Sequence, residues 1–483
     1  MVNNLTSKAT QVNTTHEFQA GEPVHINGLN VVCNVEKELG SGTQGKVYSL
    51  ISPDNSLLVL KWYFPSMATN EQFDILKSLI QKESPSNRFL WPLALVKSPK
   101  KEGFGYVMSM KDSRFKSFSL WLSRKIDPSF KALLTACFEL AQSFHLLHSK
   151  GLCYQDLSLN NIYFDPENGE IRIGDTDNIV INGDDKGNVI GTPKFMAPEI
   201  IVGKALPNTQ TDLYSLAIIL FYILFLNHPL EGKIESSIKS LDLPSMSKLY
   251  GFEPLFIFDP SNDSNYPDPA FHANALIFWS IYPDFIKRIF IRAFTDGIKD
   301  PMHGRVRETE WQIALLALRD SIYYCRHCKS ENFLVPDFLF FEKLKIPVEL
   351  GGVNSDVKVS KLSSIVEGVQ KNPVCWNPKC KTMNTHILTI RIDDRLLVAL
   401  NHDTKLFLHH IDPDRKYDFS SPVAEVSRHP TDPRVWGLRN LSAYPWKVGN
   451  ANGDVIEVYS KQSFSLVPGI QIDFGTSRGI VCY

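Results

Sequence analysis

The chain has 483 residues, a length that suits two to four domains, and a formal net charge of −1 at pH 7. This charge gives no overall reason to expect nucleic acid or a membrane surface as a partner. Hydrophobic residues make up 43% and charged residues 21% of the chain, as in soluble globular proteins.

The N-terminal residues 1–21 are polar and rich in Asn and Thr, which predicts a disordered tail. They have neither the apolar core of a signal peptide nor the arginines of a transit peptide, so we expect a cytoplasmic protein. The longest apolar run, residues 213–226, is shorter than the ~20 residues that a membrane span needs, and it predicts a buried helix. Residues 271–294 are apolar with interspersed charges and predict one helix or a pair of helices.

A glycine triplet followed by a lysine forms the first candidate motif. Gly40, Gly42 and Gly45 would let a strand-turn-strand approach a triphosphate closely, with backbone N–H groups facing its oxygens. Lys61 follows at hairpin distance and would reach the α and β phosphates from a buried strand. The residues expected to contact a nucleotide are Gly40, Ser41, Gly42, Thr43, Gln44, Gly45, Val47, Lys61, Met108 and Met110.

Two later segments supply oxygen-bearing side chains. Asp156 opens residues 156–161 and would accept the proton of a substrate hydroxyl or orient that hydroxyl. Asn161 and Asp175 offer hard oxygen ligands for Mg²⁺. Phosphoryl transfer requires positioning and charge neutralisation, and Lys61 with these three groups would provide both. Each fragment alone is weak evidence, but chance explains their order and spacing poorly.

In this order the segments resemble the active site of the eukaryotic-like protein kinase family. Residues 191–199 resemble the end of its activation loop, and residues 212–217 resemble the start of the helix that supports its catalytic loop. Arg305 resembles the arginine that pairs with the glutamate matching Glu199. The resemblance covers about residues 30–320. It implies an α+β, bilobal fold and a kinase that uses ATP and Mg²⁺ on a protein substrate. Serine or threonine is favoured because the catalytic loop lacks the Ala-Arg arrangement of tyrosine kinases.

Several residues depart from the family pattern. Tyr154 and Gln155 replace its His-Arg pair, so no cation awaits an activation-loop phosphate. Ser158 replaces a lysine, which removes a positive charge near the γ-phosphate. Between positions 175 and 199 the hydroxyl residues are Thr176 and Thr192, and Thr192 matches the threonine that packs near the catalytic aspartate. We therefore predict switching without loop phosphorylation.

Other departures leave alternatives open. Asp177 stands where the family has glycine, and it either caps a turn or adds a carboxylate near the metals. In the helix predicted from residue 71 to residue 80, either Gln72 or Glu71 would partner Lys61. A pseudokinase scaffold that binds nucleotide as a switch is one rival function. A kinase-fold phosphotransferase acting on a small molecule is the other.

Four of the eight cysteines form two knuckles, Cys325 with Cys328 and Cys375 with Cys380. In a reducing compartment they predict a structural Zn²⁺ held by four thiolates, with a redox pair and buried unliganded cysteines as rivals. We expect His327 to face solvent. The long gap between the knuckles suggests an insertion that contains a strand at 338–341. The other cysteines are expected to be small buried or terminal thiols, namely Cys33, Cys137, Cys153 and Cys482.

From residue 386 onward, short strands at regular spacing predict a β-sandwich of about 100 residues. The expected strands are 386–391, 396–400, 405–409, 436–438, 455–459, 464–466, 472–475 and 479–481, with a hairpin turn at Asp393-Asp394. The segment resembles a divergent forkhead-associated domain. Residues 426–429 resemble that family's phosphate-side loop, in which Ser427 and Arg428 would bind phosphothreonine. A sandwich that packs on the kinase or on a protein partner is the alternative.

A narrower resemblance lies in residues 61–65 and 89–93. They are similar to a bacterial kinase group with a zinc ribbon after the catalytic domain, found in tellurite-resistance-linked stress systems. By analogy it implies a PP2C-type phosphatase and a von Willebrand factor A protein as partners. The predicted domains are a tail (1–21), a kinase domain (22–320), a zinc-ribbon-like module (321–384) and a β-sandwich (385–483).

Overall fold

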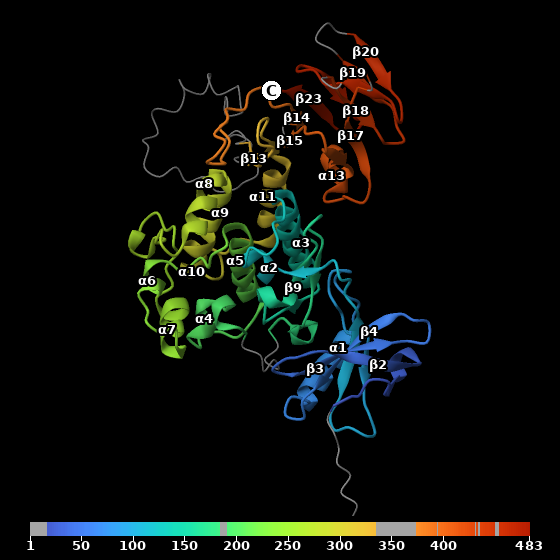
Figure 1. The fold of residues 1–483 in the computed structure, drawn as a ribbon, viewed down its shortest axis with the longest axis vertical. Helices are drawn as coiled ribbons and strands as arrows, with labels where there is room; N and C mark the ends of the chain where they lie inside the picture. Colours follow the sequence, from blue (N-terminus) through green and yellow to red (C-terminus); the bar gives the residue numbers. More distant parts are fainter. Residues whose placement is uncertain are drawn as a thin grey trace, which may run out of the picture.

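The computed structural model describes residues 17–183, 191–334 and 373–483, except 394, 430, 433, 434 and 450–453. A small lobe built on one sheet is followed by a helical lobe, a cysteine-bearing hairpin and a C-terminal sandwich (Figure 1). The expected α+β, bilobal architecture is thus confirmed. Residues 1–16 of the predicted tail lie outside the described residues. Packing already begins at Phe18, whose ring lies edge-on to Tyr48 and Trp62 at 5.5 and 5.1 Å.

The small lobe is an antiparallel sheet with the strand order β1-β2-β3-β4-β6-β5, and one helix packs against it. Its elements are β1 (Pro23–Ile26), β2 (Val31–Ser41), β3 (Gly45–Ile51), β4 (Leu57–Tyr63), α1 (Asn70–Gln81), β5 (Ala94–Val96) and β6 (Gly105–Ser109). Side chains alternate between the two faces of a strand. On β4, Leu60 and Trp62 enter one buried cluster, while Val59 and Tyr63 enter another. Lys61 shares the face of Val59 and Tyr63.

The large lobe is built around helix α5 (Thr209–Phe225), most of whose residues are buried. Asn208 caps this helix, because its side chain accepts the N–H groups of Gln210 and Thr211. Residues 271–294, predicted to form one helix or a pair, form the two helices α8 (Ala273–Ile281) and α9 (Asp284–Phe294). The other helices of this lobe are α2 (Phe118–Leu122), α3 (Phe130–Ser149), α4 (Pro198–Ile201), α6 (Lys233–Ser236), α7 (Leu243–Ser247), α8 (Ala273–Ile281), α9 (Asp284–Phe294), α10 (Asp296–Lys299) and α11 (Glu308–Asp320). In the described ranges no helix has the length and apolar character needed to cross a bilayer.

Short strands carry the loops that bear the predicted acidic groups. They are β7 (Lys116–Ser117), β8 (Leu152–Cys153), β9 (Ile162–Phe164), β10 (Ile171–Ile173) and β11 (Val180–Ile181). Strand β8 pairs with β11, and β9 lies between β10 and β7. Asp156 lies three residues after the end of β8, and Asp175 lies two residues after the end of β10. The loop after β10 contacts the small lobe, since Asp175 lies 3.5 Å from Lys61 of β4.

A hairpin of β12 (Ile322–Tyr324) and β13 (Glu331–Phe333) follows α11 and holds the first cysteine knuckle at its turn. The second knuckle lies inside an isolated bridge between Val374 and Met383. We call these two pieces, residues 322–334 and 373–385, the ribbon. The strand predicted at 338–341 lies outside the described residues.

The C-terminal segment is a sandwich of two antiparallel sheets, as predicted. One sheet has the order β15-β14-β23-β22-β19-β20 and the other β16-β17-β18-β21. Apolar side chains from both sheets form one buried cluster. The strands are β14 (Thr389–Ile392), β15 (Leu396–Ala399), β16 (Lys405–Phe407), β17 (Pro422–Arg428), β18 (Trp436–Asn440), β19 (Trp446–Gly449), β20 (Val455–Val458), β21 (Ser463–Ser465), β22 (Gln471–Asp473) and β23 (Arg478–Cys482).

Two expectations for the sandwich were wrong. The strand predicted at 405–409 ends at Phe407 and gives way to helix α13 (Leu408–Ile411), because His410 Nδ1 accepts the Phe407 N–H at 2.9 Å and starts a helical turn. The segment 426–429 is not a loop. Ser427 and Arg428 pair with Gly437 and Trp436 of β18, so they continue a strand.

The sandwich packs on helices α3 and α11 of the large lobe (Figure 1). Lys131 of α3 forms an ion pair of 2.9 Å with Asp403. The ring of Phe138, also on α3, lies 5.4 Å from that of Tyr417. Because contacts from both helices and from β12 hold the sandwich, the C-terminal domain and the large lobe form a continuous packed unit.

Candidate functional site

Lys61 lies where the two lobes meet, and its ammonium has three oxygen partners. Its side chain is 8% exposed, and Nζ donates to Asp177 Oδ2 and to Gln44 Oε1, each at 2.8 Å. Asp175 Oδ1 lies 3.5 Å away. A lysine has three N–H donors, and these oxygens match that number. Lys61 is thus fixed between the glycine-rich hairpin and the loop after β10.

Asp177 is the anchor of this group. Its side chain is fully buried, and it accepts hydrogen bonds from Lys61, from the Tyr63 hydroxyl and, at 3.0 Å, from the Tyr106 hydroxyl. The backbone of Asp175 is left-handed, with φ 43°, and starts the short turn η3 (Thr176–Asn178). This turn directs Asp177 into the small lobe. The alternative that Asp177 caps a turn was wrong. The other alternative, a carboxylate near the metals, stays a prediction, since Asp175 and Asp177 both contact Lys61.

Neither Gln72 nor Glu71 partners Lys61. Gln72 of α1 donates to the Tyr63 hydroxyl at 3.2 Å and to the Asp177 carbonyl at 3.0 Å. Glu71 is exposed in the first turn of α1. The carboxylate that the family pattern places on this helix is therefore supplied by Asp177. The sequence held a signal for this exchange, because a glutamine stands at the glutamate position and a carboxylate at a glycine position.

The pKa values in this group follow from burial and charge. Burial opposes ionisation of Asp177, but the charge of Lys61 and the hydrogen bonds it receives hold its pKa below the usual value. Burial and the nearby Asp177 raise the pKa of Asp175, although Lys61 acts in the opposite direction. Burial also disfavours the charge of Lys61, yet the two carboxylates keep its pKa above the usual value. Asp177 and Lys61 thus form a buried ion pair.

The catalytic-loop candidates lie together as predicted. Asp156 Oδ1 accepts a hydrogen bond of 3.0 Å from the Thr192 hydroxyl, which confirms the expected neighbour. Asn161 donates its side-chain N–H to the Asp156 carbonyl at 3.0 Å, and its own carbonyl accepts the Gly174 N–H at 2.7 Å. These bonds connect the loop of Asp156 to the loop that carries Asp175.

The substituted residues before Asp156 are buried. The Tyr154 hydroxyl donates to the Gly174 carbonyl, which ties the catalytic loop to the residue before Asp175. The backbone N–H groups of Tyr154 and Gln155 donate to the two carboxylate oxygens of Asp212, at 2.6 and 3.2 Å. Gln155 is 9% exposed, and its side chain is neutral where the family has an arginine. The helix that begins near Asp212 therefore supports the loop as expected.

The glycine-rich hairpin forms over this group. Its turn joins β2 and β3, and Gly42 N–H donates to the Gly45 carbonyl at 2.9 Å. A side chain at Gly45 would collide with the Trp62 carbonyl, at 2.1 Å, whereas one at Gly40 would meet nothing within 4 Å. Gly45 is thus needed for packing, and Gly40 leaves open space beside the hairpin. Ser41 is the last residue of β2, and Thr43 lies in the turn.

Apolar candidates for the nucleotide site also gather here. Met108 of β6 belongs to one buried cluster beneath the sheet, and Val47 and Met110 pack against the same cluster. Because these three side chains come from β3, β6 and the residue after β6, the sheet brings them to one place. They would suit the flat apolar face of a nucleotide base.

Comparison with known proteins agrees with this geometry. A family model described as "Protein kinase domain" matches residues 33–293, more than half of the chain. The chain belongs to the protein kinase family. It is 26% identical over 187 residues to "Probable serine/threonine-protein kinase glkA" of Dictyostelium discoideum, a match that covers 38% of each chain. It is also 24% identical over 156 residues to "Protein kinase gsk3" of Schizosaccharomyces pombe, covering 31% of this chain and 40% of the relative.

A third relative is "Dual serine/threonine and tyrosine protein kinase" of Danio rerio, 30% identical over 104 residues. That match covers 22% of this chain and 11% of the relative. This chain therefore spans well under half the length of each of these three relatives. The family model ends at residue 293, before the ribbon and the sandwich.

The kinase domain also contains the predicted late ion pair. Arg305 donates to Glu199 at 2.6 Å and to the Gln210 carbonyl at 2.5 Å. Both side chains are largely buried, so the pair fixes the end of the segment 191–199 against the start of α5. This segment contains Thr192, which is hydrogen-bonded to Asp156.

A buried histidine makes the stability of the kinase domain dependent on pH. His148 lies between Asp212, at 3.1 Å, and Glu308. Burial opposes its charge, but the two carboxylates raise its pKa from 6.5 to about 9. Stabilisation by the charged imidazole is therefore complete below pH 6.5 and is lost as the pH rises through about 9. The loss should be about 3 kcal/mol of unfolding free energy.

Urea unfolding of the wild type and of His148→Gln at pH 6 and pH 9.5 measures this loss. The wild type should lose about 3 kcal/mol more than the variant between these pH values. An equal loss in both proteins would show that His148 is not the responsible group.

The four predicted cysteines lie together in the ribbon. Their Sγ atoms are all within 4.8 Å of one another, with 3.7 Å between Cys325 and Cys380 and 3.6 Å between Cys328 and Cys375. A disulfide needs about 2.05 Å, so these are separate thiols. Four sulfurs around a tetrahedral Zn²⁺, each about 2.3 Å from it, would lie about 3.8 Å apart. The donor set and the spacing fit Zn²⁺.

Hydrogen bonds around the cysteine cluster connect it to the kinase domain. Asn332 donates to Cys375 Sγ at 3.7 Å, and the Trp376 indole donates to the Glu331 carbonyl at 2.7 Å. The Glu331 side chain in turn accepts the backbone N–H of Phe130, at the start of α3, at 2.5 Å. The neighbouring His327 is exposed, as expected, and its Nδ1 lies 3.6 Å from Cys380 Sγ.

Proposed function

We propose that the chain is a MgATP-dependent serine/threonine protein kinase that transfers the γ-phosphate of ATP to a protein hydroxyl. The observation that carries this proposal is the complete set of four core groups around one point. Lys61 is charged and is held by Asp177, and Asp156 is oriented by the Thr192 hydroxyl. Asn161 and Asp175 lie on two loops that are joined by hydrogen bonds. A scaffold without catalysis has no need to keep all four in place.

Each of the four core groups would have a role in phosphate transfer. Lys61 would hold the α and β phosphates in place of its bond to Gln44, with a charge that its pairing to Asp177 maintains. Thr192 occupies Oδ1 of Asp156, which leaves Oδ2 to accept the proton of the substrate hydroxyl. Asn161 and Asp175 would hold Mg²⁺, which neutralises charge on the phosphates when bound.

Activation should not require phosphorylation of the described part of the loop after Asp175. The Thr176 hydroxyl is buried and donates to the Leu90 carbonyl at 2.7 Å, so it is closed to another kinase. The Thr192 hydroxyl is already bonded to Asp156. With Gln155 in place of an arginine, a phosphate on this loop would also find no cation there.

A protein substrate is favoured over a small molecule. Segment 191–199 is held in place by Arg305, and Lys194 in its middle is paired with Glu231 at 2.8 Å. This segment resembles the peptide-docking region of protein kinases and lies next to Asp156. A fixed platform beside the catalytic carboxylate suits an extended peptide more than a freely diffusing metabolite.

The test is transfer of labelled γ-phosphate from ATP to the chain itself and to a generic protein acceptor. The wild type would be compared with Asp156→Asn and Asp175→Asn, with Mg²⁺ and without metal. We expect transfer that needs Mg²⁺ and is lost in both variants. If ATP binds and no phosphate moves to any protein acceptor, the proposal fails and the nucleotide-binding scaffold replaces it. Transfer to a metabolite instead would identify a small-molecule phosphotransferase.

We further propose that the four cysteines hold one structural Zn²⁺ in the ribbon. A site closed by four thiolates leaves no position for substrate, so the ion would stabilise and not catalyse. The narrower resemblance adds a role in bacterial stress signalling, with a PP2C-type phosphatase and a von Willebrand factor A protein as partners. Binding of purified candidates of these two classes to the chain would test that assignment.

A further inference from the structure

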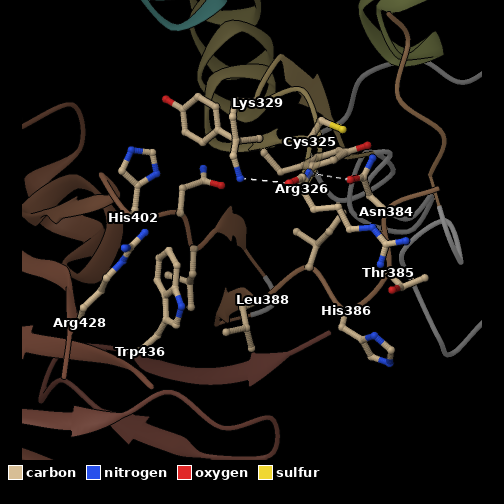
Figure 2. A pocket seen from close by; sticks show the side chains of 15 residues that line it. Cys325, Arg326, Lys329, Asn384, Thr385, His386, Leu388, His402, Arg428 and Trp436 are labelled. Carbon is tan, nitrogen blue, oxygen red and sulfur yellow. Dashed lines mark hydrogen bonds between the residues drawn. The ribbon is translucent and has the colours of Figure 1, made fainter. Parts of the chain in front are cut away.

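A cavity of about 730 Å³ lies between the ribbon and the sandwich, away from the active site. Residues of the first knuckle, of the link between the ribbon and β14, and of strands β17 and β18 line it. In Figure 2, Arg428, Trp436 and His402 lie along one side, while Arg326, Thr385 and His386 lie along the other. Leu388 lies between the two sides.

The lining is basic. It contains Arg326, Lys329 and Arg428, with His386 and His402 beside them, and among the lining residues that the structure describes there is no aspartate or glutamate. Among the described residues, none of the three cations takes part in an ion pair, although the chain as a whole carries nearly balanced charge. A concave site lined by unpaired charges of one sign attracts an anion.

Two of the three cations, Lys329 and Arg428, have side-chain contacts that hold them in position. Lys329 Nζ donates to the Arg326 carbonyl at 3.0 Å, which leaves two of its N–H groups free to donate elsewhere. The Arg428 guanidinium lies over the Trp436 ring, 5.1 Å from its centre, so its edge remains available for hydrogen bonds. The backbone N–H of Arg326 is fixed by Asn384 at 3.0 Å. Groups that are ordered in advance lose less freedom on binding.

Balancing the charge of the knuckle thiolates would explain only part of this arrangement. Arg326 and Lys329 belong to the knuckle, and cations there offset a cluster of four thiolates. Arg428 comes from β17 of the sandwich, where it stacks on Trp436 and not on the ribbon. Its presence in the same cavity calls for a ligand that both domains share.

The other lining residues indicate what kind of anion would fit. Leu388, Leu400 and Trp436 give the cavity an apolar wall, and Asn401 adds a polar group. A free inorganic ion would not use this apolar surface. A peptide with a phosphorylated side chain would place its phosphate among the cations and its neighbouring side chains against the wall.

We propose that this cavity binds a phosphothreonine- or phosphoserine-containing segment of a protein. The proposal rests on the proposed function, since a kinase domain in the same chain makes ligands of this chemistry. Of the segment that resembles the forkhead-associated phosphate-side loop it uses Arg428 but not Ser427, which lies inside β17 and is not among the lining residues. The ligand would bridge ribbon and sandwich, and so the chain would retain its own products or primed substrates.

The test uses the full chain with the Asp156→Asn change, so that no transfer alters the probe. An oriented peptide library with a fixed phosphothreonine is selected on the immobilised protein. The best binder and its unphosphorylated form are then measured by fluorescence anisotropy. We expect the phosphorylated form to bind at least about tenfold more tightly, and Arg428→Ala and Lys329→Ala each to weaken it about tenfold.

Arg439→Ala is the matched control, because Arg439 lies on the neighbouring strand and is paired with Glu425 at 3.1 Å. This variant should bind as the parent protein does. Equal binding of both peptide forms, or binding unaffected by Arg428→Ala and Lys329→Ala, would overturn the proposal. Displacement of a bound dye by inorganic phosphate with no peptide selected would also overturn it and assign a site for small anions.

The proposed phosphopeptide site and the proposed kinase activity can be overturned independently of each other. Phosphopeptide binding is measured without ATP turnover, whereas phosphate transfer is measured in the chain with native Asp156. Loss of binding in Arg428→Ala with unchanged transfer to a generic acceptor would leave the kinase function standing and locate the peptide site in the cavity. Absence of transfer with intact binding would overturn the kinase function alone.

Discussion

Replacing Asp177 with asparagine should lower kcat/KM for phosphate transfer at least about a hundredfold. The change keeps the size of the side chain but removes the fully buried charge that pairs with Lys61. Asp175, only 3.5 Å from Nζ, would then become the main partner of the lysine and be drawn from metal binding. Both phosphate positioning and metal binding would suffer.

The same variant should be less stable by up to about 3–5 kcal/mol, because Lys61 loses its nearest buried partner and the more distant Asp175 replaces it only in part. Thermal unfolding and ATP affinity would be measured beside kcat, so that a protein that merely fails to fold is recognised. A folded variant with a low kcat and weakened ATP binding is the expected result.

Glu71→Gln is the matched control for this prediction. Glu71 is an exposed carboxylate on α1, next to the position where the family has its glutamate. Its loss should change kcat/KM less than about twofold, as for most exposed substitutions. A large loss in Glu71→Gln with normal activity in Asp177→Asn would show that α1 supplies the partner after all.

A second variant pair tests whether the carboxylate has moved from α1 to the turn η3. Asp177→Gly should be nearly inactive, since Lys61, Tyr63 and Tyr106 all lose their acceptor. Adding Gln72→Glu would return a carboxylate beside the Tyr63 hydroxyl, which Gln72 contacts at 3.2 Å. We expect kcat/KM of the double variant to be at least about tenfold higher than that of Asp177→Gly alone. No recovery would argue against this exchange.

Removing the metal from the ribbon should have the second large effect. The purified chain should contain one Zn²⁺ per molecule by elemental analysis, and a strong chelator or Cys328→Ser/Cys380→Ser should remove it. Because the ribbon contacts the start of α3 through Glu331, we expect the melting temperature to fall by about 10 °C or more. Transfer by the kinase domain at lower temperature should remain, since the ribbon adds no side chain to the active site.

Cys482→Ser is the control for this experiment, since Cys482 lies in β23, outside the cluster. It should keep the metal and the melting temperature of the wild type. Protein that holds no zinc as purified, or a double variant that still holds it, would contradict the assignment. A disulfide detected in the native chain would favour the redox alternative.

The pairing of Lys61 also has a consequence for regulation. In this chain the carboxylate lies on η3, directly after Asp175, and α1 reaches it only through Gln72, which bonds to Tyr63 and to the Asp177 carbonyl. A displacement of α1 alone would break these two bonds but not the ion pair itself. Control of activity is thus expected to act through the loop after β10.

The sequence by itself determined which chemical groups the protein has and in which elements they lie. The spacing of Gly45, Lys61, Asp156 and Asp175 predicted the kinase fold and the candidate catalytic groups, because each sits at a fixed offset from a strand or helix end. The knuckle spacing likewise predicted the cysteine cluster. Such local patterns depend on backbone geometry over a few residues, which the sequence expresses directly.

Only the tertiary structure decided which groups are partners. Asp177 is 116 residues from Lys61, and its role depends on the left-handed backbone of Asp175 and on two tyrosine hydroxyls from different strands. The cavity that Arg428 shares with the ribbon likewise requires two domains to be packed together. Burial and distance decide which of several nearby charges pair, and both arise only when distant segments are assembled.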